Sequence, residues 1–156
     1  MQVHALEMDD FYEEEYSLIG IHSTLEDYRL AYLLNKTIKT RFYKAKEDLE
    51  FIKQEKKISF SIYNYENIDY DFDWFLIANS CRKENQQVTN ELLLTSETKT
   101  YLIPEYKKVD FFIKITGDVN ATFVANIVQK IKSIEQVITA YSINKNSLKS
   151  KDFLIF

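Results

Sequence analysis

The stretch from residue 101 to residue 118, YLIPEYKKVDFFIKITGD, contains the only proline of the 156-residue chain and one of its two glycines. A proline has a fixed φ and no N–H to donate, so it can end or border a strand but cannot lie inside a central one. Between Pro104 and Gly117 lies VDFFIKI, a run of β-branched and aromatic residues that is typical of a strand. We therefore predict a corner at 104–107, a central strand at 109–115 and a glycine-assisted turn into a helix.

The first half of the chain predicts a strand followed by a helix. Residues 16–22 read YSLIGIH, and Ser23 and Thr24 each have an acidic residue three positions further on, which is the spacing of a capping box. We expect the helix to span 25–38 and the chain to become extended again at 42–45. The apolar residues of the helix recur at helical spacing. They are Leu30, Ala31, Leu34 and Ile38.

The second half repeats this plan, with a strand at 111–115, a helix whose cap is Asp118 or Asn120, and a strand at 137–143. When the two helices are aligned, the two halves form a strand–helix–strand pseudo-repeat. The alternative is a chance match, because amphipathic segments of this kind resemble one another. We predict a single domain, 1–156, of the α+β class, with a mostly antiparallel sheet and two helices on one face.

Between the halves, the segments 58–65 and 70–80 predict an antiparallel hairpin that turns at 66–69. In this register Tyr63 lies opposite Phe72, and directly opposed residues share a face of the sheet. One face of the hairpin therefore collects aromatic side chains. The rest of the middle region is predicted as a polar loop at 82–90, a strand at 92–95 and a strand at 99–103.

Composition and charge exclude several classes of function. The net charge is −4 and no block of basic residues occurs, whereas a nucleic-acid-binding protein needs a concentrated basic surface. Cys81 is the only cysteine, so no disulfide can form within the chain. The acidic N-terminus lacks a signal-peptide pattern and no apolar run is as long as a membrane span. We expect a cytoplasmic protein without membrane contact, nucleic acid or a bound cofactor.

A short motif lies in the organising stretch. Residues 103–110 read I-P-E-x-x-x-V-D. This pattern resembles the signature of the bacterial IPExxVD family, with one more residue between the glutamate and the valine than that signature has. The segments DYRLAYLLNKTI and LIPEYKKVDFFIKI extend the similarity to much of the chain. The resemblance implies a small single-domain protein, and because the family has no assigned function it implies no catalytic role for any residue.

The sequence contains six candidate residues for a binding site: His22, Tyr63, Trp74, Pro104, Glu105 and Asp110. His22 lies where a strand meets a helix, which suits a catalytic base and equally suits a turn histidine bonded to a backbone carbonyl. Trp74 and Tyr63 would either stack on a ligand or pack beneath the helices as core. We favour the structural interpretation for His22, and we also favour it for Trp74 and Tyr63.

Glu105 and Asp110 lie on either side of the predicted corner that Pro104 begins. As a functional pair they would bind or react at the rim of the sheet. As structural residues, Glu105 would accept hydrogen bonds from corner N–H groups and Asp110 would pair with a nearby lysine or arginine. We favour the structural roles. Asp69, Asp71 and Asp73 alternate along a strand, but no set of catalytic, cofactor-binding or metal-binding residues is predicted.

These patterns predict a non-enzymatic interaction or regulatory module that forms a homodimer. The expectation of self-association rests on the apolar C-terminus, residues 153–156, because such a run rarely stays exposed. It would add an edge strand, fill a groove on the same molecule or contact a second copy. The alternative function is a small-molecule-binding protein, or a small enzyme, that uses a pocket on the aromatic sheet face.

Overall fold

The computed structural model of the chain describes residues 15–53, 55–67, 72–89, 92–154 and 156. The predicted leading segment at 2–14 and most of the alternating aspartates lie outside the described residues. The elements are β1 (Tyr16–Ser23), α2 (Asp27–Ile38), β2 (Tyr43–Lys44), β3 (Leu49–Lys53), β4 (Lys56–Phe60), β5 (Ile62–Asn67), β6 (Phe72–Ala78), β7 (Ser80–Thr89), β8 (Leu92–Tyr101), β9 (Phe111–Thr116), α3 (Ala121–Lys132) and β10 (Val137–Ile143), with 3₁₀ turns at η1 (Pro104–Tyr106), η2 (Lys145–Ser147) and η3 (Lys151–Leu154).

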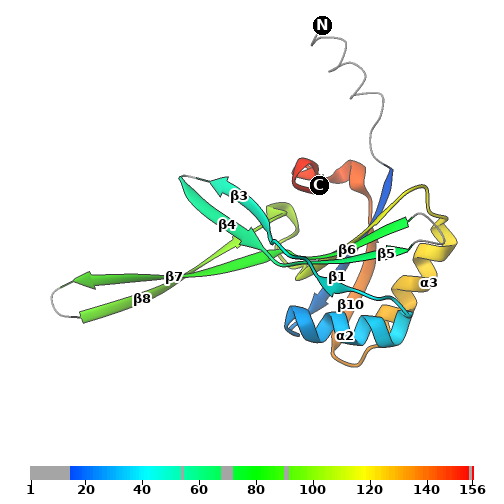
Figure 1. Cartoon of the computed structure of the whole chain (residues 1–156), viewed down its shortest axis with the longest axis horizontal. Coiled ribbons are helices and arrows are strands. Elements are labelled where there is room, and N and C mark those ends of the chain that lie inside the picture. The colour runs from blue at the N-terminus through cyan, green and yellow to red at the C-terminus, as the bar shows by residue number, and fades with distance from the viewer. Residues whose placement is uncertain (1–14, 54, 68–71, 90–91, 155) are drawn as a thin grey trace, which may run out of the picture.

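One antiparallel sheet of six strands organises the body, in the order β10-β1-β9-β6-β5-β2 (Figure 1). β9 and β10 lie on either side of β1, and β1 and β6 lie on either side of β9. The chain therefore contains two interlocked units, β1–α2–β6 and β9–α3–β10, each split by a strand of the other. This is the topology of ferredoxin-like folds. The hairpins β3–β4 and β7–β8 are two-stranded sheets outside this core.

Both helices lie on the same face of the sheet and pack against each other (Figure 1). This confirms the predicted α+β class and the mostly antiparallel sheet. The predicted stripe of the first helix is buried throughout, and the second helix buries Val124, Ile127, Val128 and Ile131. The sheet residues beneath the helices are Ile19, Ile21, Tyr63, Trp74, Leu76, Phe111, Ile113, Ile115, Val137 and Ala140.

The pseudo-repeat has a structural counterpart with one difference. Ile19 of β1 lies directly opposite Ile113 of β9, so the two corresponding strands meet at the centre of the sheet. The strand expected at 42–45 is only the short edge strand β2. In the first unit, the strand that corresponds to β10 of the second unit is β6. The chain inserts β2 to β5 between α2 and β6, which the sequence spacing did not reveal.

The predicted register of the central hairpin is wrong by four positions. Tyr63 lies opposite Leu76, and Tyr65 lies opposite Trp74, because β5 continues through Asn67 before the chain turns. The shift is an even number of residues, so the same side chains still share a face. The predicted single strand at 58–65 is divided at Ser61, where the chain passes from the β3–β4 hairpin into the main sheet.

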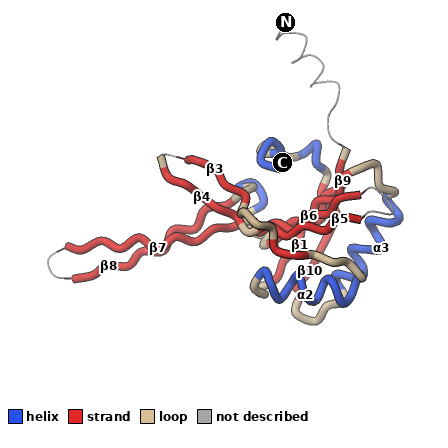
Figure 2. Tube along the Cα trace, viewed as in Figure 1, coloured by secondary structure: helices blue, strands red, loops and turns tan. Residues whose placement is uncertain are grey.

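The predicted loop at 82–90 is also wrong. Residues 80–89 form β7, which pairs with an uninterrupted β8 from Ser80 opposite Tyr101 to Thr89 opposite Leu92. Figure 2 shows this ribbon extending away from the body. The segment 82–90 reads RKENQQVTN and lacks the alternation of apolar and polar residues that marks a strand in a sequence.

The corner and the turns agree closely with the sequence. Pro104 begins the 3₁₀ turn η1, β9 is central, and Gly117 has φ +97° in the turn that follows. The side chain of Asn120 caps α3 by accepting a hydrogen bond from the Thr122 N–H (2.7 Å). The capping box expected at α2 is absent, because the N-cap residue Glu26 makes no side-chain cap bond.

Neither described helix is long and apolar enough to span a membrane.

The C-terminal segment fills a groove on its own molecule. Leu154 is fully buried on the face of the sheet opposite the helices, and the Phe153 ring lies edge-on to Phe51 (5.0 Å between centroids). We call this face the opposite face. Its buried residues are Leu18, Ile58, Phe60, Ile62, Ile77, Leu102, Ile103, Val109, Phe112, Ile143, Leu148 and Leu154.

Candidate functional site

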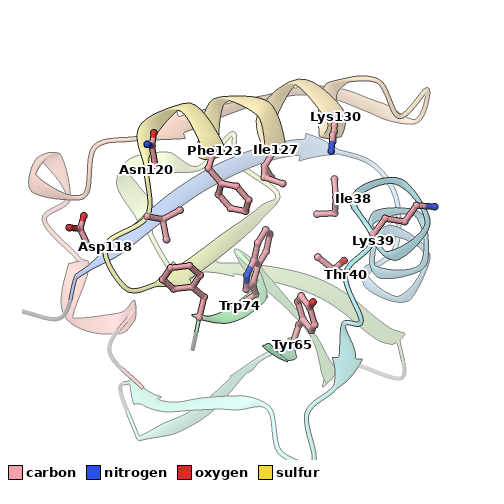
Figure 3. A pocket seen from close by; sticks show the side chains of 12 residues that line it. Ile38, Lys39, Thr40, Tyr65, Trp74, Asp118, Asn120, Phe123, Ile127 and Lys130 are labelled. Atoms are coloured by element: carbon pink, nitrogen blue, oxygen red, sulfur yellow. The ribbon is translucent and has the colours of Figure 1, made fainter. Parts of the chain in front are cut away.

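A cavity of about 660 Å³ opens where the C-terminal end of α2 approaches α3 and the strands β5 and β6 (Figure 3). Its volume lies within the range of small-molecule sites, roughly 300–1,000 Å³. We call it the aromatic pocket. Its lining residues are Ile38, Lys39, Thr40, Tyr65, Phe72, Trp74, Asp118, Val119, Asn120, Phe123, Ile127 and Lys130.

Trp74 is the centre of the pocket wall. Its ring centroid lies 6.0 Å from that of Tyr65, 6.1 Å from that of Phe123 and 6.4 Å from that of Phe42. The contact with Phe123 is edge-to-face, an arrangement that aromatic pairs favour. Trp74 is 5% exposed, whereas Phe123 is 41% exposed. The pocket is therefore walled by rings of which one, Phe123, retains a large solvent-accessible surface.

Local sequence holds both sides of the pocket in place. After α2, the Asn35 side chain clamps the chain: its Oδ1 accepts from the Thr40 hydroxyl and from the Phe42 N–H, both at 2.8 Å. This clamp brings Phe42 against Trp74. On the other side, a Cβ atom at Gly117 would lie 2.7 Å from the Phe72 ring, so only glycine permits this close turn.

The polar groups of the pocket differ in what they contact. Asn120 is engaged as the cap of α3, and Thr40 is bonded to Asn35. Figure 3 shows the Lys130 side chain directed from α3 toward the cavity, while those of Lys39 and Asp118 extend away from it. The pocket thus combines aromatic walls with one ammonium group aimed at the interior.

Tyr63 shares the aromatic face of the hairpin but does not line the pocket. It is buried, and this burial, followed by the nearby charge of Asp27, raises the pKa of its hydroxyl. The Lys44 ammonium lies 5.2 Å from the Tyr63 ring centroid and forms an ion pair with Asp48 (2.9 Å). Ser61 also donates a hydrogen bond to Asp27. Tyr63 therefore belongs to a polar cluster that fastens β5 to the start of α2.

The other candidate residues lie on the opposite face, around the corner at 102–110. Sequence reasoning missed the residue that organises this corner, Asn79, whose side chain is buried. Its side-chain carbonyl accepts a hydrogen bond from the Ile103 N–H (2.8 Å). Its side-chain amide donates to the carbonyls of Tyr106 (2.9 Å) and Val109 (2.8 Å). The only local signal was an asparagine that directly follows an apolar strand.

Glu105 and Asp110 are held by different partners within this corner. The carboxylate of Glu105 accepts from the Ser150 N–H (2.9 Å) and the Ser150 hydroxyl (3.0 Å), which ties the corner to the C-terminal segment. Asp110 accepts from the Ser23 N–H (2.8 Å). This last bond replaces the lysine or arginine partner predicted for Asp110, because the carboxylate lies beside the bulge that ends β1.

His22 lies on the same face. Its Nε2 atom is 2.8 Å from the hydroxyl of Tyr141, and the two rings are 5.4 Å apart. The expected bond to a backbone carbonyl is therefore wrong, because the neighbouring strand β10 presents a tyrosine hydroxyl instead. Burial, followed by the nearby Tyr106, raises the pKa of Tyr141.

The structure thus separates the predicted site residues into two groups. Trp74 and Tyr63 lie under the helices, and His22, Glu105 and Asp110, with Pro104, lie on the opposite face. Among the described residues, no three histidine, cysteine, aspartate or glutamate side chains are placed to hold a metal ion. The aromatic pocket is the arrangement best suited to binding.

Comparison of the chain with known protein families, with curated proteins and with solved structures finds no match. The resemblance to the IPExxVD family therefore stays a prediction.

Proposed function

We propose that this protein is a binding module without catalytic activity that takes a small, largely apolar aromatic molecule into the aromatic pocket. The observation that carries the proposal is the cavity of about 660 Å³ with Trp74 and Phe123 in its wall. An apolar cavity with a few polar groups is the usual form of a small-molecule site. Rings in its wall favour a flat ring between them, by offset-stacked or edge-to-face contacts.

The state of the other candidate residues supports binding rather than catalysis. His22 is bonded to Tyr141, Glu105 to Ser150, and Asp110 to the backbone of Ser23. None of the three lines the aromatic pocket. A catalytic base must be within hydrogen-bond reach of the proton that it removes, and these side chains are occupied in holding the fold.

The experiment uses the fluorescence of Trp74, which is the only tryptophan in the chain. Naphthylmethanol, a neutral aromatic probe, is titrated into the protein while tryptophan emission is recorded. We expect a saturable change in wild type and a weakened one in Phe123→Ala, which removes part of the wall. Tyr28→Ala is the matched control, because Tyr28 is an exposed ring on α2 outside the pocket. A folded wild type that shows no saturable change would overturn the proposal.

A second candidate function, self-association through the β7–β8 ribbon, is supported by a different observation. Ten residue pairs form this ribbon, and within the described chain it is a sheet of two strands only. Isolated two-stranded ribbons are marginally stable in water, and their open edges pair readily with other strands. A homodimer joined through this ribbon would satisfy those edges.

Sedimentation of a shortened variant tests this second candidate. Replacing residues 84–97 with Asn-Gly joins Lys83 to Thr98, which face each other in the ladder, through a two-residue turn. We expect the wild type to sediment as a dimer and the shortened variant as a folded monomer. A monomeric wild type at all accessible concentrations would exclude the candidate. The cytoplasmic location remains a prediction from the sequence.

A further inference from the structure

The aromatic pocket contains an asymmetry of charge that bears on what it binds. Lys130 lies in the last turn of α3 and its side chain is directed toward the cavity (Figure 3). Asp118, the acidic residue of the lining, extends away from the interior (Figure 3). The charge that faces a bound molecule is therefore positive.

Lys130 also differs from the lysines that support the fold. Lys44 pairs with Asp48 at 2.9 Å, and Lys145 pairs with Glu15 at 3.2 Å. In the part of the chain that the structure describes, no ion pair or hydrogen bond involves the ammonium group of Lys130. An ammonium group beside apolar rings, without a carboxylate from the protein, is a natural partner for an anion brought by a ligand.

A structural role for Lys130 offers a weaker explanation. α2 ends at Ile38, across the cavity, and a cation near the C-terminal end of a helix interacts favourably with its dipole. No hydrogen bond joins Lys130 to a carbonyl of α2 among the described residues. The dipole of α2 also does not explain why the Lys130 side chain is directed toward the cavity. The Lys39 side chain lies at the same end of α2 and points outward (Figure 3).

We propose that the ligand of the aromatic pocket is an aromatic carboxylate, with its ring against Trp74 and Phe123 and its acid group on the ammonium of Lys130. This inference rests on the proposed function and narrows it from apolar aromatic molecules to anionic ones. A neutral ring would use the walls alone. A cationic ring would meet the repulsion of Lys130.

The test compares probes that share one ring system and differ in charge: naphthoate, naphthylmethanol and naphthylmethylammonium. Wild type is expected to bind naphthoate about fivefold more tightly than naphthylmethanol at low salt, as one partly exposed charged hydrogen bond allows. Added salt is expected to reduce this preference, because it screens the pair. Affinities are read from the emission of Trp74.

Lys130→Gln is expected to abolish the preference for naphthoate over naphthylmethanol. Lys39→Gln is the matched control, since it removes a lysine of the same pocket that points away from the cavity. Its preference for naphthoate should remain. Circular dichroism is the check that each variant is folded.

The outcomes separate this inference from the proposed function. Equal binding of the three probes, or a Lys130→Gln variant that still prefers naphthoate, overturns the anionic ligand but keeps the pocket. If naphthylmethylammonium binds more tightly than naphthoate, the proposed anionic ligand is overturned in favour of a cationic ligand near Asp118. Absence of binding by all three probes overturns both proposals.

Discussion

The two faces of the sheet are covered in different ways. On one face, α2 and α3 lie side by side and bury their apolar stripes (Figure 1). On the opposite face, the cover is the corner at 102–110, the β3–β4 hairpin and the C-terminal segment, all short or irregular pieces of chain. Straight helices meet a twisted sheet imperfectly at their ends, and the aromatic pocket lies at such an end.

Irregular cover requires polar bonds that helices do not need, because its backbone N–H and C=O groups have no partners within a helix or ladder. Asn79, Glu105 and Asp110 supply such bonds on the opposite face. Glu105 and Asp110, which the sequence singled out as candidate site residues, thus each make a bond that holds this cover in place. The helix face holds the aromatic pocket of about 660 Å³, whereas the cavity beside Pro104 on the opposite face is smaller, about 260 Å³.

Lys114 is the most unusual part of the opposite face. It is 0% exposed, and its ammonium donates to the Leu154 carbonyl (2.6 Å). The same ammonium lies 4.6 Å from the ring centroid of Phe156 and 4.9 Å from that of Tyr16. Burying a charge costs several kcal/mol unless such partners compensate it. Lys114 thus holds the C-terminal segment in place. Removing this segment would leave the buried lysine with fewer partners.

Ending the chain after Ser150 is expected to have the largest effect on stability. This truncation uncovers the apolar core around Leu154. It also removes the Leu154 carbonyl, which accepts a hydrogen bond from the Lys114 ammonium. We expect a loss of about 5 kcal/mol in the free energy of unfolding, the sum of lost burial and of the partners that a buried charge loses. Urea denaturation followed by circular dichroism measures this loss.

The same truncation in a Lys114→Met background sharpens the prediction. Methionine leaves no charge behind, so the truncation should cost about 2 kcal/mol less than it does in the wild-type background. Equal costs in the two backgrounds would show that Lys114 and the C-terminal segment contribute independently.

Trp74→Ala is expected to have the next largest effect, on the helix face. Removing a buried tryptophan costs about 3–5 kcal/mol, and we expect a value near the lower limit because the new space joins an existing pocket. The measurement is the midpoint of thermal unfolding by circular dichroism. An unchanged midpoint would mean that the ring contributes little to packing and serves the ligand alone.

Asn79→Ala tests the opposite face and should cost about 3 kcal/mol, because three backbone groups each lose a hydrogen bond and two of these bonds are buried. Hydrogen exchange should accelerate at 102–110 and stay unchanged in α2 and α3. Naphthylmethanol affinity should also stay unchanged, since the pocket lies on the other face. Slower binding or weaker affinity in this variant would show that the two faces are coupled.

Glu105→Gln is expected to have the smallest effect. Its two bonds to Ser150 lie at the surface, so their loss should cost less than about 1 kcal/mol. The denaturant midpoint should shift slightly, and the pocket should bind its probes as before. A loss as large as that of Asn79→Ala would give Glu105 a role that these contacts do not explain.

Periodicity predicted the elements that pack against the core. The stripe of α2 was read correctly, from Leu30 to Ile38, because burial on one side of a helix leaves a repeat in the sequence. The ribbon β7–β8 and the division of the hairpin at Ser61 were not predicted. Neither is marked by a local repeat, since the first includes the polar run 82–90 and the second depends on which sheet each segment joins.

The candidate site was predicted only in part. Trp74 was identified as a candidate aromatic residue, and it lies in the pocket wall. Phe123 and Lys130 were not identified, because they lie on a helix whose sequence shows only its buried stripe. Asn79 was also missed, since its three partners follow it at 24 to 30 positions along the chain.

By itself, the sequence determined the two amphipathic helices, the central strand between Pro104 and Gly117, and the face on which Tyr63, Tyr65 and Trp74 lie. These features follow from local rules: backbone geometry of proline and glycine, and the periods of helix and strand. Tertiary structure alone decided that the helix layer leaves a pocket beside Trp74, and that Lys114 is buried under the C-terminal segment. Both depend on contacts between segments far apart in the chain, where packing rather than local preference determines which space is filled.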